Sequence, residues 1–116
     1  MRKFILVLSF TTLFVGSISA QDAVAKKGQG IFESKGCAVC HKKDIDTIGP
    51  SLQTIATAYV GKETSLLSYL RGQGTPIVEP ARAPVMDPQL VKIRSLFDED
   101  MQALATYLIS ANDRPF

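Results

Sequence analysis

The sequence of 116 residues has few of the side chains that build metal and catalytic centres. It contains one histidine, His41, and two cysteines, Cys37 and Cys40. A tetrahedral zinc site needs about four nitrogen, sulfur or oxygen ligands, and neighbouring Cys40 and His41 are an awkward pair for such a geometry. No Ser-His-Asp arrangement, phosphate-binding loop or nucleic-acid patch is present. The usual hydrolytic and nucleotide-binding functions are therefore not indicated.

The sequence also lacks an apolar run of transmembrane length. Residues 4–15 are almost wholly apolar, but a spanning helix needs roughly 20 such residues. A basic start precedes this run and small residues follow it up to Ala20, which is typical of a secretory signal. We expect a signal peptide at residues 1–20 and one small domain at 21–116, exported to a bacterial periplasm. Cleavage after Ser19 and an uncleaved anchor are the alternatives.

Excess charge is missing from the predicted mature part. The whole chain has 13 basic and 11 acidic residues. Arg2 and Lys3 would leave with the signal, so the remainder has a formal net charge of zero. A balanced charge gives no argument for binding nucleic acid or a membrane surface. We expect no nucleic-acid partner and no membrane contact except through membrane-bound partner proteins.

The run Cys37-Ala38-Val39-Cys40-His41 is the most informative feature of the chain. Cys-x-x-Cys-His is the attachment signature of c-type haem. Residues three and four apart share a helix face, so both thiols can reach the vinyl groups on one side of a porphyrin. His41 then points at the iron as its proximal ligand. A zinc site, a thioredoxin-like redox pair and a plain disulfide are the competing interpretations.

Helical spacing dominates the mature part, and no clean strand alternation occurs. Gly36 would end the first helix in a left-handed conformation, and the haem motif would follow as a short helical turn. The sequence predicts an all-α domain of four to five short helices around one covalently bound haem. The expected helices cover residues 22–34, 51–59, 63–71 and 98–111.

A long stretch without a predicted helix separates the last two of these helices. Residues 72–97 contain four prolines at intervals of four, which forbid a continuous helix, and residues 91–96 could form a short extended piece. Loops of this length are uncommon in compact domains and are often functional. The stretch is too apolar for a disordered tail, so we expect it to cover a haem face. Its prolines are Pro76, Pro80, Pro84 and Pro88.

These features together resemble the class I c-type cytochromes, in particular the small bacterial monohaem proteins, over essentially all of the mature part. Besides the haem motif, Gly49-Pro50-x-Leu52 is similar to the family's loop after that motif. Pro84-x-Met86-x-Pro88 is similar to the loop that presents the distal methionine. The crossed first and last helices of the family are matched by Gly28-x-x-x-Phe32 and Leu104-Ala105-x-Tyr107-Leu108.

The resemblance implies a cytochrome c-like fold and specific roles for two further residues. The Pro50 carbonyl would accept a hydrogen bond from the proximal histidine, and Met86 would be the distal ligand. The chain departs from the family pattern in four respects, one of which is a stretch after Met86 that is longer than in the smallest relatives. Asp87 separates Met86 from the next proline, Phe97 stands where a Ser or Thr cap usually opens the last helix, and tryptophan is absent.

Met86 is also the best candidate ligand among the three methionines. Met1 would leave with the signal, and Met101 lies on the apolar stripe of a predicted helix, where methionine commonly fills space. A thioether favours ferrous iron, so His/Met ligation raises the reduction potential. The alternative is that Met86 is one more apolar residue beneath the haem.

With both axial positions filled, the iron has no open site for a substrate. We therefore expect a monomeric electron carrier, not an enzyme, that exchanges single electrons with protein donors and acceptors. A haem subunit of a larger oxidoreductase is one alternative. The other is an open-site haem protein with peroxidase or gas-binding activity.

Three lysines flank the haem motif and could form a basic rim for an acidic partner, since rim charges mostly set association rates. They are Lys35, Lys42 and Lys43. Nearby Asp44 and Asp46 partly cancel this charge. An ordinary solvated face is the alternative.

Overall fold

The computed structural model describes residues 19–113. Five α-helices make up this part of the chain, and no strand occurs in it, which confirms the all-α prediction. The helices are α1 (Ala20–Ser34), α2 (Leu52–Tyr59), α3 (Glu63–Leu70), α4 (Ala83–Leu90) and α5 (Asp98–Ile109). Short 3₁₀ turns occupy Cys37–Val39, Pro80–Arg82 and Ser110–Asp113. Within residues 19–113 no helix has both the length and the apolar character to cross a membrane.

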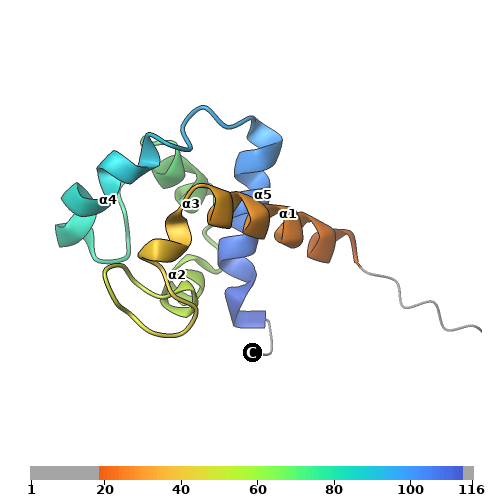
Figure 1. Cartoon of the computed structure of the whole chain (residues 1–116), viewed down its shortest axis with the longest axis horizontal. Coiled ribbons are helices and arrows are strands. Elements are labelled where there is room, and N and C mark those ends of the chain that lie inside the picture. Colours follow the sequence, from red (N-terminus) through yellow and green to blue (C-terminus); the bar gives the residue numbers. More distant parts are fainter. Residues whose placement is uncertain (1–18, 114–116) are drawn as a thin grey trace, which may run out of the picture.

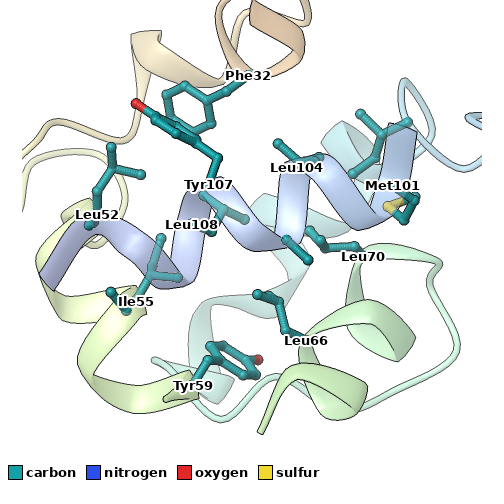
Figure 2. Packing of buried hydrophobic residues seen from close by; sticks show 14 of the residues in the cluster. Phe32, Leu52, Ile55, Tyr59, Leu66, Leu70, Met101, Leu104, Tyr107 and Leu108 are labelled. Carbon is teal, nitrogen blue, oxygen red and sulfur yellow. The ribbon is translucent and has the colours of Figure 1, made fainter. Parts of the chain in front are cut away.

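Helices α1 and α5 cross in close contact at the centre of the fold (Figure 1). Gly28 permits the approach, since a Cβ there would lie 1.9 Å from the Ala103 carbonyl oxygen and 2.7 Å from Tyr107 Cβ. Phe32 packs on Tyr107 with ring centroids 5.4 Å apart (Figure 2). Lys27 Nζ pairs with Glu99 and Asp100 at 2.8 Å each. The predicted helix crossing is therefore present.

Helices α2 and α3 pack on the same central helix and complete the core. Ser51 begins α2, where its Oγ accepts a hydrogen bond from the Thr54 backbone N–H at 3.1 Å. The apolar stripe of α5 lies in the middle of this cluster, as its spacing predicted. Members shown in Figure 2 include Leu52, Ile55, Tyr59, Leu66, Leu70, Met101, Leu104 and Leu108, all at most 8% exposed.

The distal segment, residues 72–97, differs from the prediction. The expected absence of one continuous helix is confirmed. The segment nevertheless contains the 3₁₀ turn Pro80–Arg82 and helix α4, which were not predicted. The prediction failed because two of the prolines, Pro80 and Pro84, occupy first-turn positions, where the missing N–H has no helical partner to lose. Only Pro88 lies beyond the first turn of α4, which ends two residues later. Residues 91–96 form turns, so the predicted extended piece is also wrong.

The predicted signal peptide lies mostly outside the described residues. The structure begins at Ser19, whose Oγ accepts a hydrogen bond from the Asp22 backbone N–H at 3.3 Å and caps α1. The helix itself starts at Ala20, two residues before the predicted start. Cleavage after Ala20 would remove this cap and leave α1 to begin at the new terminus.

Candidate haem-binding site

The Cys-x-x-Cys-His run lies on a tight turn directly after α1. Gly36, with a φ of 77°, ends the helix as predicted. The turn Cys37–Val39 follows, and the Cys37 carbonyl accepts hydrogen bonds from the backbone N–H groups of Cys40 at 3.2 Å and His41 at 3.0 Å. This local geometry brings both thiols and the imidazole to one cavity, where all three are half-buried.

His41 is held in one tautomer by the loop that follows the motif. Its Nδ1 lies 2.7 Å from the Pro50 carbonyl oxygen, as the resemblance implied. A carbonyl oxygen only accepts, so Nδ1 carries the proton and donates. The lone pair therefore lies on Nε2, and this is the arrangement of a histidine that binds metal through Nε2.

Gly49 is required at this loop because of its distance to the imidazole. A Cβ there would lie 2.7 Å from His41 Cε1 and 2.9 Å from Nδ1. Two hydrogen bonds tie the loop to the motif: the Cys40 carbonyl accepts from Gly49 N at 2.9 Å and from Thr47 Oγ1 at 3.2 Å. The loop and the motif are thus tied together, and both Gly49 and Pro50 of the loop contact the His41 ring.

Asp46 supports the far end of this loop. Its carboxylate accepts hydrogen bonds from the Ser51 backbone N–H at 2.7 Å and from Thr54 Oγ1 at 3.1 Å. These bonds favour the ionised form and lower the pKa of Asp46 below its ordinary value of 3.8. The motif, the loop and the start of α2 are consequently joined through side chains as well as backbone.

A cavity of about 1040 Å³, its opening included, extends from the motif across to the distal segment. Most of its lining is apolar and comes from all five helices and the connecting loops, which is typical of a site for a large apolar ligand. Apolar lining residues include Phe32, Ile55, Leu66, Leu70, Val78, Val85, Met86, Ile93, Leu104 and Leu108.

The two remaining methionines have different surroundings. Met86 lies on α4 and not in a loop, which corrects the prediction, but it is half-buried and lines the cavity. Met101 is fully buried in the α5 stripe, away from the cavity lining, as predicted. Of the two, only Met86 lines the cavity that His41 also borders.

Two tyrosines form part of the cavity wall. Tyr59 Oη accepts a hydrogen bond from the Ile77 backbone N–H at 3.3 Å. Burial, with lesser contributions from Asp87 and Tyr59, raises the pKa of Tyr69 to about 12, so its hydroxyl stays protonated. The sequence analysis did not single out Tyr69, although its spacing of three from the apolar Leu66 would have indicated an inward position.

Charged side chains in the lining come from one short stretch. Glu79 and Arg82 both border the cavity and pair with each other at 3.2 Å. Among residues 19–113, Arg82 is the one arginine or lysine in the lining. The sequence analysis did not single out either residue, since an exposed Glu and Arg three apart carry no distinctive signal.

Comparison with known families decides what the cavity holds. The sequence profile of the Cytochrome c family matches residues 25–112, which is most of the chain. This chain belongs to the cytochrome c family. The match covers the crossed helices, the motif and the distal segment together, so the sequence-based resemblance is confirmed.

Similar proteins in bacteria include several named cytochrome c-551. That of Pseudomonas aeruginosa is 28% identical over 101 residues, which are 84% of this chain and 89% of the relative. That of Stutzerimonas stutzeri is 40% identical over 48 residues, covering 41% of this chain and only 46% of the relative. The chain therefore aligns along nearly the whole length of the first and less than half of the second.

As a cytochrome c, the protein has haem c as its cofactor, joined through Cys37 and Cys40. The cavity fits this group, because an apolar space meets two thiols and an imidazole with a free Nε2 lone pair. Burial raises the pKa of the Cys37 thiol, which disfavours the thiolate that a zinc site requires. Within the described part of the chain, no three His, Cys, Asp or Glu side chains are grouped to hold a bare metal ion.

Proposed function

We propose that this protein is a periplasmic electron carrier whose haem iron is bound by His41 and Met86. Bound haem supplies a reversible one-electron change between ferric and ferrous iron. The observation that carries the proposal is the convergence of Cys37, Cys40, His41 and Met86 on one apolar cavity. Two axial protein ligands would leave no position for a substrate, so the protein acts as a carrier and not as an enzyme.

The chain's own residues explain how the site is prepared. Pro50 fixes the His41 tautomer, and Gly49 lets the loop approach the ring. The cavity walls are mostly apolar, and the protonated Tyr69 adds no charge to them. A thioether ligand at Met86 raises the reduction potential relative to a second nitrogen ligand.

The ferric absorption spectrum tests the ligand assignment. We expect a low-spin wild type with a sulfur-to-iron charge-transfer band. Met86→Ala should abolish this band, lower the reduction potential and admit added cyanide or carbon monoxide. The matched control is Met101→Leu, which should keep the band and cost under about 1.5 kcal/mol of unfolding free energy.

Loss of the band in Met101→Leu with retention in Met86→Ala would reverse the assignment. A high-spin ferric wild type would instead favour the open-site peroxidase or gas-binding function. Stable co-purification with a large oxidoreductase would favour the role of a complex subunit. A carrier should purify as a monomer and exchange electrons with protein partners on each encounter.

We also propose that residues 1–20 direct export and are removed. The support is the basic start, the short apolar run and the small residues before Gln21 in the sequence. N-terminal sequencing of periplasmic material should begin at or close to Gln21. Mass spectrometry of the same material should show one haem per chain that acid-acetone does not extract.

A further inference from the structure

We propose that Glu79 and Arg82 form a rim clasp that holds Met86 over the haem by joining the distal segment to the His41 loop. Arg82 would thus be a positioning residue for the distal ligand and would not touch the iron. This inference rests on the proposed His41 and Met86 ligation.

The clasp is built from three contacts made by one guanidinium. Arg82 Nη1 donates to both carboxylate oxygens of Glu79, at 3.4 and 3.2 Å. Its Nη2 donates to the Ile48 carbonyl oxygen, which lies 34 residues earlier in the chain. A guanidinium group presents five N–H donors in a rigid planar fork, so it fixes the geometry of such contacts more strictly than an ammonium group with three rotatable donors.

The acceptor of the clasp belongs to the loop that orients His41. Ile48 stands between Thr47 and Gly49, which are both hydrogen-bonded to the Cys40 carbonyl. The next residue, Pro50, accepts the hydrogen bond from His41 Nδ1. Arg82 therefore connects the segment before α4 to the loop that is hydrogen-bonded to the haem motif.

Packing alone holds α4 weakly, which is why such a connection matters. Leu90 is the single buried residue of this helix, while Val85 is 59% exposed. In Figure 1, α4 lies at the edge of the molecule, whereas α5 runs through its centre. Met86 lies four residues after Arg82, so the position of the clasp limits how far the thioether can move from the cavity.

The backbone at Glu79 indicates that this carboxylate is held in place. Its φ of 45° and ψ of 56° make it the only non-glycine residue with positive φ among residues 19–113. Such a conformation is unfavourable for a residue with a side chain and persists where surrounding contacts require it. Glu79 directly precedes Pro80, and its conformation sets the start of the 3₁₀ turn that carries Arg82.

The test is carbon monoxide binding to the ferrous haem protein, because the gas must displace Met86. Arg82→Met should increase the apparent affinity about tenfold, since it removes every clasp contact. Glu79→Gln should increase it about threefold, because one neutral acceptor and the Ile48 contact remain. Arg82→Lys should give a carbon monoxide affinity between those of the wild type and Arg82→Met.

Arg94→Met is the matched control, since Arg94 is exposed and outside the cavity lining. Its carbon monoxide affinity should equal that of the wild type.

The direction of the changes in Arg82→Met and Glu79→Gln distinguishes a clasp from a simple charge effect. If Arg82 and Glu79 acted only through their fields, removing the cation would lower the reduction potential and removing the anion would raise it. Carbon monoxide affinity would then match wild type in both, and the clasp would be wrong. A clasp instead gives increases of the same sign in both variants and a weaker charge-transfer band in ferric Arg82→Met.

Failure of the proposed function has a different signature. A wild type without the sulfur-to-iron band overturns the Met86 ligation, and the clasp with it. A wild type with the band and variants of unchanged affinity overturns the clasp alone. If Arg82→Met does not fold, Glu79→Gln and Arg82→Lys still decide the question, since both preserve side-chain size.

Discussion

The crossing of α1 and α5 and the distal segment are held in place by different means. At the crossing, backbone meets backbone at Gly28, two rings interlock and Lys27 pairs with two carboxylates. In the distal segment only Leu90 and Ile93 are buried. Its four prolines and hydrogen bonds made by the guanidinium groups of Arg71 and Arg82 give it its shape. The crossing is thus held by close packing of side chains and backbone, whereas the distal segment has few buried side chains and is held largely by hydrogen bonds.

The largest expected effect falls on the crossing. Gly28→Ala places a methyl group 1.9 Å from the Ala103 carbonyl oxygen. The obstacle is backbone, so the two helices must separate, and we expect a loss of about 3 kcal/mol or more of unfolding free energy. Denaturant unfolding of the haem protein measures it.

Gly30→Ala is the control for this prediction, because nothing lies within 4 Å of a Cβ at that position. Alanine should stabilise α1 there by up to about 1 kcal/mol through helix propensity. Equal effects of the two substitutions would show that close contact does not explain Gly28.

A smaller effect is expected at the one buried residue of α4. Leu90→Ala removes a side chain that is 1% exposed, a change that costs about 2–5 kcal/mol in a typical core. We expect the lower end, near 2 kcal/mol, because the sparsely packed distal segment can relax into the space. Val91→Ala, at a side chain 62% exposed, should cost little. A cost for Leu90→Ala above that for Gly28→Ala would reverse the comparison.

A gain in stability is expected where α5 begins. Phe97 is 83% exposed and makes no side-chain capping hydrogen bond. Phe97→Ser should supply an oxygen to the free N–H groups of the first turn and stabilise the protein by about 1 kcal/mol. Thermal unfolding would show it, with Phe97→Ala as a control that removes the ring without adding a cap. A loss of stability in Phe97→Ser would imply that the exposed ring packs on something.

The smallest effect concerns the pH dependence of the His41 loop. The pKa of Asp46 is lower in the folded protein than in the unfolded chain. Its contribution to stability is therefore present above the unfolded pKa of about 4 and is lost as pH falls through the folded pKa. Wild type should therefore exceed Asp46→Asn in stability near neutral pH, and the difference should close below about pH 4. A difference that grows on acidification would contradict the hydrogen-bond assignment.

Sequence reasoning was accurate where the structure depends on near neighbours in the chain. The haem motif, the helix stop at Gly36 and the stripe of α5 follow from residue spacing, and Met101 was correctly placed in the core. The distal segment was mispredicted, because a proline at a first-turn position and a proline in a loop look alike in a sequence. Met86 was correctly expected near the haem cavity, although on the wrong type of element.

By itself, the sequence determined the cofactor, the two cysteines that attach it and the helical class. These depend on the spacing of residues along the chain and on helical periodicity, and both act over only a few residues. Only the tertiary structure decided that Arg82 reaches the Ile48 carbonyl, that Tyr69 lines the cavity and that Gly28 faces Ala103. Such contacts join positions far apart along the chain, so they arise only when the packing of the helices has set which surfaces meet.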